Sequence, residues 1–239
     1  MVFGNDQPVL VSLIIPVYNE EATLAEVVAR VYAVNLGNFA REVVVCDDGS
    51  SDGTSRIITE LRARYPELKT YVAPINFGKG AAVRVGMSLA SGDIIMVQDA
   101  DLELDPADIP QVLAPFADPA VKVVYGSRYL RSSRKGARAN RWANRFLTWL
   151  TNVLYGGKLT DMETAYKAFR REVLEGIRLR SVRFDFEPEV TAKILRACYR
   201  IVEVPVSYQP RTAAQGKKMA WGDGFDAIYT LFRWRFLGR

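Results

Sequence analysis

Hydrophobic and polar positions follow two different patterns along the first half of the chain. Short, continuous apolar runs rich in β-branched residues predict buried strands at residues 9–16, 42–47, 69–73, 93–98 and 121–125. The segments between them repeat apolar residues at helical spacing and predict helices at residues 20–34, 52–64, 80–90 and 108–116. Strands that alternate with helices in this way predict an α/β fold, with a Rossmann-like, mostly parallel sheet and helices on both faces.

A polar or glycine-rich loop follows each of the predicted strands. These loops cover residues 16–20, 47–54, 76–80, 98–103 and 126–128. The carboxyl ends of parallel strands meet at one edge of a sheet, and ligands of such sheets bind there. The loops therefore predict a single binding site rather than a set of unrelated turns.

Two carboxylates one residue apart follow the fourth predicted strand. The side chains of Asp99 and Asp101 point to the same side if the chain stays extended. Two negative charges at such a short separation repel each other unless a cation lies between them. Carboxylate oxygens are hard ligands and suit Mg²⁺ or Mn²⁺. The pair therefore indicates a divalent-metal site, with Glu103 close by. The alternative is an acidic turn that caps a helix beginning near Pro106.

Residues suited to a nucleotide sugar flank this acidic pair. A nucleobase and ribose need carboxylates and a flat neighbour, and the first two loops supply Tyr18, Glu20, Asp47 and Asp48. Lys79 and Arg84 are cations near the same predicted edge. A metal held by the acidic pair would neutralise the charge of a departing diphosphate. Together these residues predict a sugar-nucleotide site.

Two segments of the second half combine aromatic and basic residues at helical spacing. They cover residues 141–155, which include Trp142, Phe146 and Trp149, and residues 221–239. Each is either a helix that faces the core or an amphipathic helix that lies on a membrane surface. We expect a catalytic domain over residues 1–210 and, in the same unit, a C-terminal loop and interfacial helix over residues 211–239.

Charge and composition narrow the range of functions. The chain has 239 residues and a net charge of +5, and the stretch between Asp118 and Asp161 contains no Asp or Glu. Such a basic stretch binds phosphates, nucleic acid or an anionic membrane surface. Histidine is absent, which excludes histidine triads and histidine zinc sites. Cys46 and Cys198 lie in apolar segments and are expected to be small core residues, which fits a reducing compartment.

Longer stretches carry a family resemblance. They are residues 12–20, 45–54, 76–80, 98–103, 125–129, 159–167, 184–187 and 203–208, followed by Arg211 and residues 216–218. In combination they resemble the family 2 glycosyltransferases with the GT-A fold. Within that family they are most similar to dolichol- or polyprenyl-phosphate sugar synthases for mannose or glucose. The resemblance covers nearly the whole chain.

The resemblance implies a role for individual residues. Pro16, Tyr18, Glu20 and Asp47 would line the nucleoside pocket, with Asp48 and Lys79 nearby. Asp99 and Asp101 would be the DXD metal pair, with Glu103 as a further metal contact. Arg128 would lie near the acceptor phosphate and the diphosphate, and Lys217 would clamp phosphate from a loop. Weaker candidates for phosphate contact are Arg141, Arg211 and Lys218, and acceptor-side or structural roles fall to Asp161 and Glu187.

The implied reaction is a single in-line displacement with inversion at the anomeric carbon. The donor would be GDP-mannose or UDP-glucose and the acceptor polyprenyl or dolichyl phosphate, which needs no general base. A soluble hydroxyl acceptor would instead need one, with Asp161 or Glu187 as candidates. The chain shows no signal segment and no apolar run of ~18 residues. We therefore expect a cytoplasmic enzyme, peripheral on the cytoplasmic face of the membrane.

Two other classes of protein fit the sequence less well. A nucleic-acid-binding module could use the basic stretch, but the chain lacks the strand-borne aromatic platforms that such modules use. A nucleotidyltransferase also uses metal-binding carboxylates. It would be expected to carry a glycine-rich, basic loop where this chain has residues 16–20.

Overall fold

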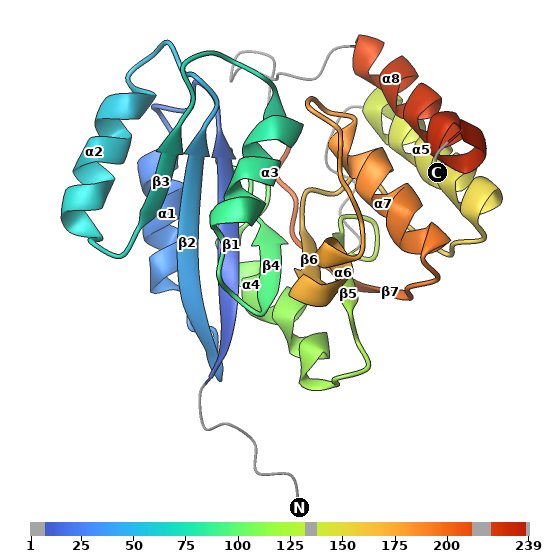
Figure 1. Cartoon of the computed structure of the whole chain (residues 1–239), viewed down its shortest axis with the longest axis horizontal. Coiled ribbons are helices and arrows are strands. Elements are labelled where there is room, and N and C mark those ends of the chain that lie inside the picture. Colours follow the sequence, from blue (N-terminus) through green and yellow to red (C-terminus); the bar gives the residue numbers. More distant parts are fainter. Residues whose placement is uncertain (1–7, 132–137, 212–220, 238–239) are drawn as a thin grey trace, which may run out of the picture.

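The apolar runs of the first half form most of one sheet. The computed structural model describes residues 8–131, 138–211 and 221–237, and within them the sheet has seven strands in the order β3-β2-β1-β4-β6-β5-β7 (Figure 1). The strands are β1 (Val9–Val17), β2 (Phe39–Asp47), β3 (Lys69–Val72), β4 (Ile94–Val97), β5 (Val123–Ser127), β6 (Lys167–Arg170) and β7 (Ile201–Pro205). The expected α/β, mostly parallel sheet is confirmed.

β6 departs from the parallel arrangement. It runs antiparallel to both β4 and β5, whereas the other neighbouring strands are parallel. In this register Lys167 pairs with Tyr125, and Ala168 pairs with Met96. The start of β6 therefore lies at the edge where β4 and β5 end. The sequence pattern does not predict β6 or β7, because charged residues break their apolar runs: Lys167 opens β6, and Glu203 lies in the middle of β7.

Helices connect the strands and cover both faces of the sheet (Figure 1). Their bounds are α1 (Leu24–Ala33), α2 (Thr54–Arg64), α3 (Lys79–Leu89), α4 (Ile109–Leu113), α5 (Arg138–Tyr155), α6 (Arg171–Glu175), α7 (Phe186–Arg196) and α8 (Trp221–Phe232). Short turns complete them at η1 (Pro106–Asp108), η2 (Ala114–Ala117) and the π-helical η4 (Arg233–Leu237). The helix predicted from residue 20 thus begins at Leu24.

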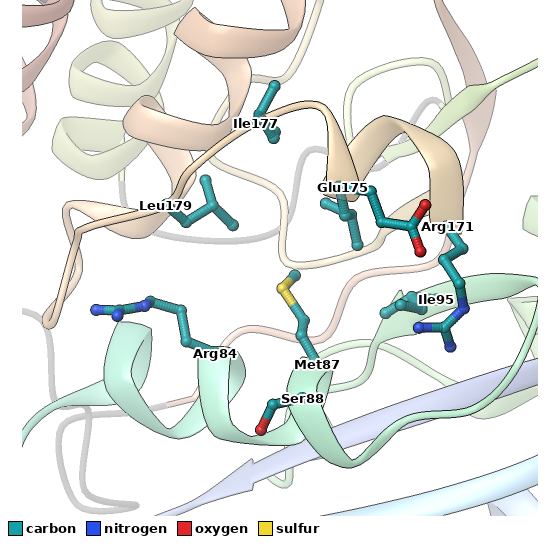
Figure 2. A pocket seen from close by; sticks show the side chains of 9 residues that line it. Arg84, Met87, Ser88, Ile95, Arg171, Glu175, Ile177 and Leu179 are labelled. Carbon is teal, nitrogen blue, oxygen red and sulfur yellow. The ribbon is translucent and has the colours of Figure 1, made fainter.

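α3 and α7 pack on one face of the sheet. Val83 of α3 and Phe186 and Val190 of α7 join a buried cluster with Val97 and Tyr125. Between α3 and α6 this face has a small hollow of about 270 Å³ (Figure 2). It lies away from the carboxyl ends of the parallel strands.

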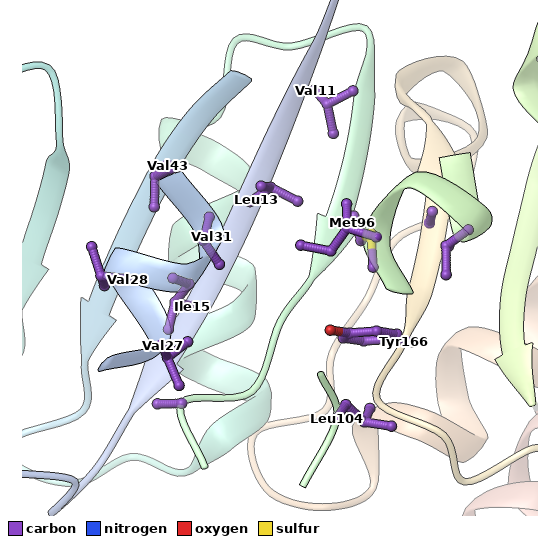
Figure 3. Packing of buried hydrophobic residues seen from close by; sticks show 14 of the residues in the cluster. Val11, Leu13, Ile15, Val27, Val28, Val31, Val43, Met96, Leu104 and Tyr166 are labelled. Carbon is purple, nitrogen blue, oxygen red and sulfur yellow. The ribbon is translucent and has the colours of Figure 1, made fainter. Parts of the chain in front are cut away.

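α1, α2 and α4 pack on the opposite face. Alternate residues of β1 point to opposite faces, so Leu13 and Ile15 face these helices while Ile14 faces α3. Val27 and Val31 of α1 lie against Leu13 and its neighbours (Figure 3). The first strand is therefore buried on both sides, which explains its continuous apolar sequence.

α5 and α8 form a further layer beside α7 (Figure 1). Leu147 and Leu150 of α5, Ala227 and Leu231 of α8, and Trp234 share a buried cluster. Trp234 is thus a core residue, not part of an exposed stripe. In the described parts of the chain, none of the helices has the length and apolar character needed to cross a membrane.

The two cysteines differ. Cys46 is fully buried, as expected. Cys198 is exposed, and the expectation that it lies in the core is wrong. The residue follows α7 with a φ of 60°, so the chain leaves the helix there and turns the side chain away from the apolar cluster.

Close packing of α3 on β1 depends on Gly86. A Cβ atom there would collide with Cγ2 of Ile14 and lie 3.3 Å from Sγ of Cys46. We expect Gly86→Ala to lower the free energy of unfolding in urea by about 1–3 kcal/mol. At Gly224 of α8 a Cβ would have no atom within 4 Å, so Gly224→Ala should raise stability by about 0.5–1 kcal/mol. Effects of the same sign would contradict this account of the packing.

Candidate active site

A cavity of about 610 Å³ opens at the edge of the sheet where β1, β4 and β5 end. Most of the residues predicted for the site line it, which shows that the strand-end loops converge on one place. These residues are Pro16, Tyr18, Glu20, Asp48, Lys79, Asp99, Asp101, Glu103, Arg128 and Arg211. Asp47 and Asp161 do not line the cavity, and Lys217 lies outside the described residues.

One end of the cavity is built on the loop after β1. Pro16 and Tyr18 line it, and the backbone N–H of Glu20 donates a 3.0 Å hydrogen bond to Oγ1 of Thr54. Arg211 donates from Nη2 to Oε2 of Glu20 at 2.7 Å. These contacts fix the carboxylate of Glu20 at the carboxyl end of β1.

The two aspartates that end β2 have different surroundings. Asp47 is 1% exposed and accepts hydrogen bonds from the N–H of Ser50, at 3.0 Å, and the hydroxyl of Ser55, at 3.2 Å. Asp47 therefore shapes its own loop behind the cavity, not the cavity wall for which the sequence suggested it. Asp48 does line the cavity. Its carboxylate accepts the N–H groups of Phe77 and Gly78 at 2.9 and 2.6 Å.

Gly78 shapes the turn that precedes α3. Its φ is 108°, a region that side chains other than glycine rarely adopt, and a Cβ would collide with the carbonyl oxygen of Val182. The turn places Lys79 at the first position of α3. A glycine is therefore required for the lysine to reach the cavity.

Lys79 bridges two acidic residues from different elements. Its Nζ lies 2.9 Å from Oδ1 of Asp99 and 2.9 Å from Oε1 of Glu187. Burial lowers the pKa of Lys79, but the two carboxylates outweigh it and hold the pKa above its usual value. Lys79 is therefore a fixed positive charge in the cavity.

The acidic residues after β4 share the next part of the wall. Asp99, Asp101 and Glu103 all line the cavity, and Leu102 between them has a φ of 56°. Burial, followed by the charges of Asp99 and Glu103, raises the pKa of Asp101 to about 7. The residue that caps the following helical turn is Asp105, whose carboxylate accepts a hydrogen bond from the N–H of Ala107 at 3.0 Å. The capping interpretation thus applies to Asp105 and not to the acidic pair.

Arg211 joins the acidic loop to the loop after β1. Its Nε donates to the carbonyl oxygen of Asp101 at 3.2 Å, and its backbone N–H donates to Oε1 of Glu103 at 2.9 Å. In the described residues, no three His, Cys, Asp or Glu side chains are grouped so that they could hold a metal ion by themselves. Any metal bound by the acidic wall would need further oxygen ligands.

Arg128, after β5, forms the opposite part of the wall. Its Nε and Nη2 each donate to Asp161 at 2.7 Å, and its backbone N–H donates to the same carboxylate at 3.0 Å. Asp161 is fully buried, so it orients the guanidinium from behind. Burial lowers the pKa of Arg128, but Asp161 outweighs it and the net shift is upward.

The remaining predicted cations lie elsewhere. Arg84 lines the hollow between α3 and α6 and donates to the carbonyl oxygen of Arg180 at 3.4 Å, so its expected position near the cavity is wrong (Figure 2). Arg141 begins the described side chains of α5 and does not line the cavity. Lys218, like Lys217, lies outside the described residues.

The cavity wall also contains residues that single-residue reasoning missed. Glu163, Arg183, Phe184 and Tyr208 line it. Glu163, Phe184 and Tyr208 occur in stretches that carry the family resemblance, so the signal was present without an assigned role. Tyr208 lies under the Arg128 guanidinium, 5.2 Å from its ring centroid, and so helps to hold the arginine.

Comparison with known proteins assigns the chain to a family. A family model described as "Glycosyl transferase family 2" matches residues 12–178. The chain belongs to glycosyl transferase family 2.

One relative is an undecaprenyl-phosphate 4-deoxy-4-formamido-L-arabinose transferase of Klebsiella pneumoniae. It is 31% identical to the family 2 chain over 210 residues, which cover 87% of this chain and 62% of that protein.

A second relative is the dolichol-phosphate mannosyltransferase of Pyrococcus furiosus. It is 31% identical over 235 residues, which cover 94% of this chain and 64% of the relative. The family 2 chain thus spans less than two thirds of the length of these curated relatives.

Solved structures show the same fold. Glucosyl-3-phosphoglycerate synthase of Mycobacterium tuberculosis, in complex with Mn²⁺, uridine diphosphate and phosphoglyceric acid, matches with a TM-score of 0.72 and 21% identity, covering 95% of this chain and 79% of that one. The complex of that enzyme with uridine diphosphate matches with a TM-score of 0.73 and 20% identity. The family 2 chain therefore has the GT-A fold that its sequence led us to expect.

The pairing of Arg128 with Asp161 has a measurable consequence for stability. Asp161→Asn keeps the shape of the side chain but leaves a largely buried guanidinium without a counter-charge. We expect the free energy of unfolding in urea to fall by about 3–5 kcal/mol. Glu26→Gln, which breaks the exposed pair with Arg30, should cost at most about 1 kcal/mol. Equal losses in the two variants would contradict the structural role of Asp161.

Proposed function

We propose that this family 2 protein transfers a hexose, mannose or glucose, from GDP-mannose or UDP-glucose to polyprenyl or dolichyl phosphate. The observation that carries the proposal is a single cavity with an acidic wall after β4 and a fixed arginine after β5. Such a cavity can take a metal-bound diphosphate at one part and a second phosphate at the other. The bacterial relative is named for undecaprenyl phosphate and the archaeal relative for dolichol phosphate, and both names support this acceptor.

The donor would lie along the strand ends. Its nucleoside would contact the loops after β1 and β2, with Asp48 and Glu20 as the available carboxylates. Asp99 and Asp101, with Glu103, would hold Mg²⁺ or Mn²⁺ together with the diphosphate. Burial, followed by the charges of Asp99 and Glu103, raises the pKa of Asp101, and a cation would offset the part that comes from the two carboxylates. Oxygen atoms of the diphosphate would supply the further ligands that the acidic wall lacks by itself. When bound, the metal neutralises charge on the departing nucleoside diphosphate.

The reaction would be one displacement at the anomeric carbon. An oxygen of the acceptor phosphate forms the new bond to that carbon while its bond to the diphosphate oxygen breaks. The nucleoside diphosphate leaves with the bonding electrons, and the configuration inverts because the acceptor oxygen attacks from the side opposite the leaving group. Arg128 would orient the acceptor phosphate by charge-assisted hydrogen bonds, and Asp161 would position Arg128. Lys217 would supply a further cation.

The two carboxylates considered as bases for a hydroxyl acceptor are both ion-paired. Asp161 is fully buried and bound to Arg128. Burial raises the pKa of Glu187, but Lys79 and Lys167 outweigh it and hold the pKa below its usual value. A carboxylate with a lowered pKa, such as Glu187, is a weak base, and Asp161 is already committed to Arg128. A phosphate, already an anion at neutral pH, needs no such base and suits the cavity better.

α5, α8 and η4 carry an exposed aromatic face that suits a membrane surface. Trp142 is 74% exposed and Phe225 is 76% exposed. Other exposed apolar residues of this face are Phe146, Trp149, Val153, Tyr229, Phe232, Phe236 and Leu237. Exposed arginines at positions 145, 233 and 235 adjoin it. We infer that this face rests on the anionic cytoplasmic surface of a membrane, where aromatic rings and arginines are both favoured.

The proposed activity can be tested with a donor panel. GDP-mannose, UDP-glucose and UDP-GlcNAc are offered with a short-chain polyprenyl phosphate and Mg²⁺ or Mn²⁺, and nucleoside diphosphate release and glycosylated lipid are measured. We expect transfer from a hexose donor, loss of transfer with excess chelator, and a drop of at least about 100-fold in kcat for Asp99→Ala. Asp105→Asn, which changes the neighbouring capping residue, should retain activity.

Two results would decide against parts of the proposal. Turnover with a hydroxyl acceptor and none with polyprenyl phosphate would exclude the lipid acceptor. Activity that persists in excess chelator, or in Asp99→Ala, would exclude the metal role.

The membrane face can be tested by sedimentation with vesicles of phosphatidylcholine and phosphatidylglycerol. Replacing Trp142 and Trp149 together by Ser should lower the partition coefficient by about tenfold or more, because two large apolar surfaces are lost. The control replaces Val72 and Leu89 by Ser, since both are exposed apolar residues away from this face. Equal binding of both double variants would contradict the assignment.

A further inference from the structure

Besides Glu187, which is ion-paired with Lys79, Glu163 is the acidic residue of the described cavity wall that the proposed chemistry leaves unused. It lies in the segment before β6 and lines the cavity. Among the described residues of the cavity wall, it alone has a buried side-chain oxygen, Oε1, without a hydrogen-bond partner. Burying a polar atom in this way is costly, and native proteins tolerate it mainly where a ligand or function requires it.

The nearby cations are engaged elsewhere. Lys79 bridges Asp99 and Glu187, and Arg128 is held by two hydrogen bonds to Asp161. Lys167 donates from Nζ to the backbone carbonyl oxygens of Met162, at 2.8 Å, and Thr164. Glu163 therefore lies among positive charges that already have partners.

The strand order places Glu163 between the two expected phosphate positions. From β1 the neighbouring strands run β4, β6 and β5. The acidic wall follows β4, Glu163 precedes β6, and Arg128 follows β5. A carboxyl group would repel a phosphate at this point. The transferred hexose would lie between the leaving diphosphate and the attacking phosphate. Its hydroxyl groups are neutral, so the carboxyl group would not repel them.

We propose that Glu163 hydrogen-bonds a hydroxyl group of the transferred hexose and thereby selects the sugar. The inference rests on the proposed function and deepens it. The terminal torsion of a glutamate side chain is soft, so a small rotation turns the unpaired oxygen toward the cavity. Burial, followed by the charge of Glu187, raises the pKa of Glu163 to about 7. Near neutral pH the carboxyl group can thus both donate and accept a hydrogen bond.

The test is binding, because binding needs no acceptor. Wild type, Glu163→Ala and Glu163→Gln are titrated calorimetrically, in Mg²⁺ or Mn²⁺, with UDP, GDP, UDP-glucose, GDP-mannose and the monodeoxy analogues of the sugar donor that binds. For wild type we expect one deoxy position to weaken binding roughly 10- to 100-fold. Glu163→Ala should bind the parent donor as weakly as that analogue and show no further loss with it. Glu163→Gln should keep part of the preference for the parent donor over the deoxy analogue.

Controls separate this role from others. Affinity for UDP or GDP should not change in Glu163→Ala, since the nucleotide lies at the other end of the cavity. Glu42→Ala removes a carboxylate that is 9% exposed in the first half of β2, away from the cavity wall. This variant should bind the parent donor and the monodeoxy analogues with the same affinities as the wild type.

The outcomes distinguish this inference from the proposed function. If the monodeoxy analogue still binds more weakly than the parent donor in Glu163→Ala, while nucleotide binding is intact, Glu163 does not contact the sugar. That result leaves the transferase proposal standing. Unchanged sugar binding in Glu163→Ala, together with lost turnover in the donor panel described above, would place Glu163 in a step after donor binding and also overturn the inference. Failure of the wild type to bind either nucleotide with metal would overturn both.

Discussion

The bridge from Lys79 to Asp99 and Glu187 is the interaction on which the cavity depends. It joins the first residue of α3, the loop after β4 and the first turn of α7 at the edge of the sheet where the cavity opens. Without the ammonium group, two carboxylates would face each other in a partly dehydrated space and repel. Arg128 and Arg211 repeat the arrangement with Asp161 and Glu20. The wall is therefore rigid before any substrate arrives, which favours catalysis by preorganised charges.

The parts of the fold that the sequence predicts are those with strong local signals. β1, β2 and β4 are buried on both faces, so their apolar runs are continuous and easily recognised. Parallel order then places their following loops on one edge, and the site follows from topology alone. β6 and β7 escape prediction because charged residues interrupt them and because they take their stability from neighbours far apart in the sequence, as Lys167 opposite Tyr125 illustrates.

Within the site, residue type was easier to predict than residue function. Asp47 and Asp161 were identified as important carboxylates, but both act from behind the cavity, on a loop and on an arginine. Sequence position cannot distinguish a carboxylate that faces a ligand from one that faces its own backbone. Arg84 was misplaced because it lies on a helix whose first residue reaches the cavity while the following turns lead away from it.

The reversed direction of β6 has a consequence for how such a site responds to substitution. In a purely parallel sheet, each strand contributes to a ligand site only through the loop that leaves it. Here the segment that enters β6 reaches the same edge, so one side of the cavity is formed by a chain arriving from α5. That arriving segment is tied to the loops beside it, because Asp161 holds Arg128 and the hydroxyl of Tyr166 donates to Oε1 of Gln98 at 2.6 Å. The cavity is thus enclosed by chain segments that run in two directions, and a substitution in the arriving segment acts on the loops after β4 and β5 as well as on the cavity wall itself.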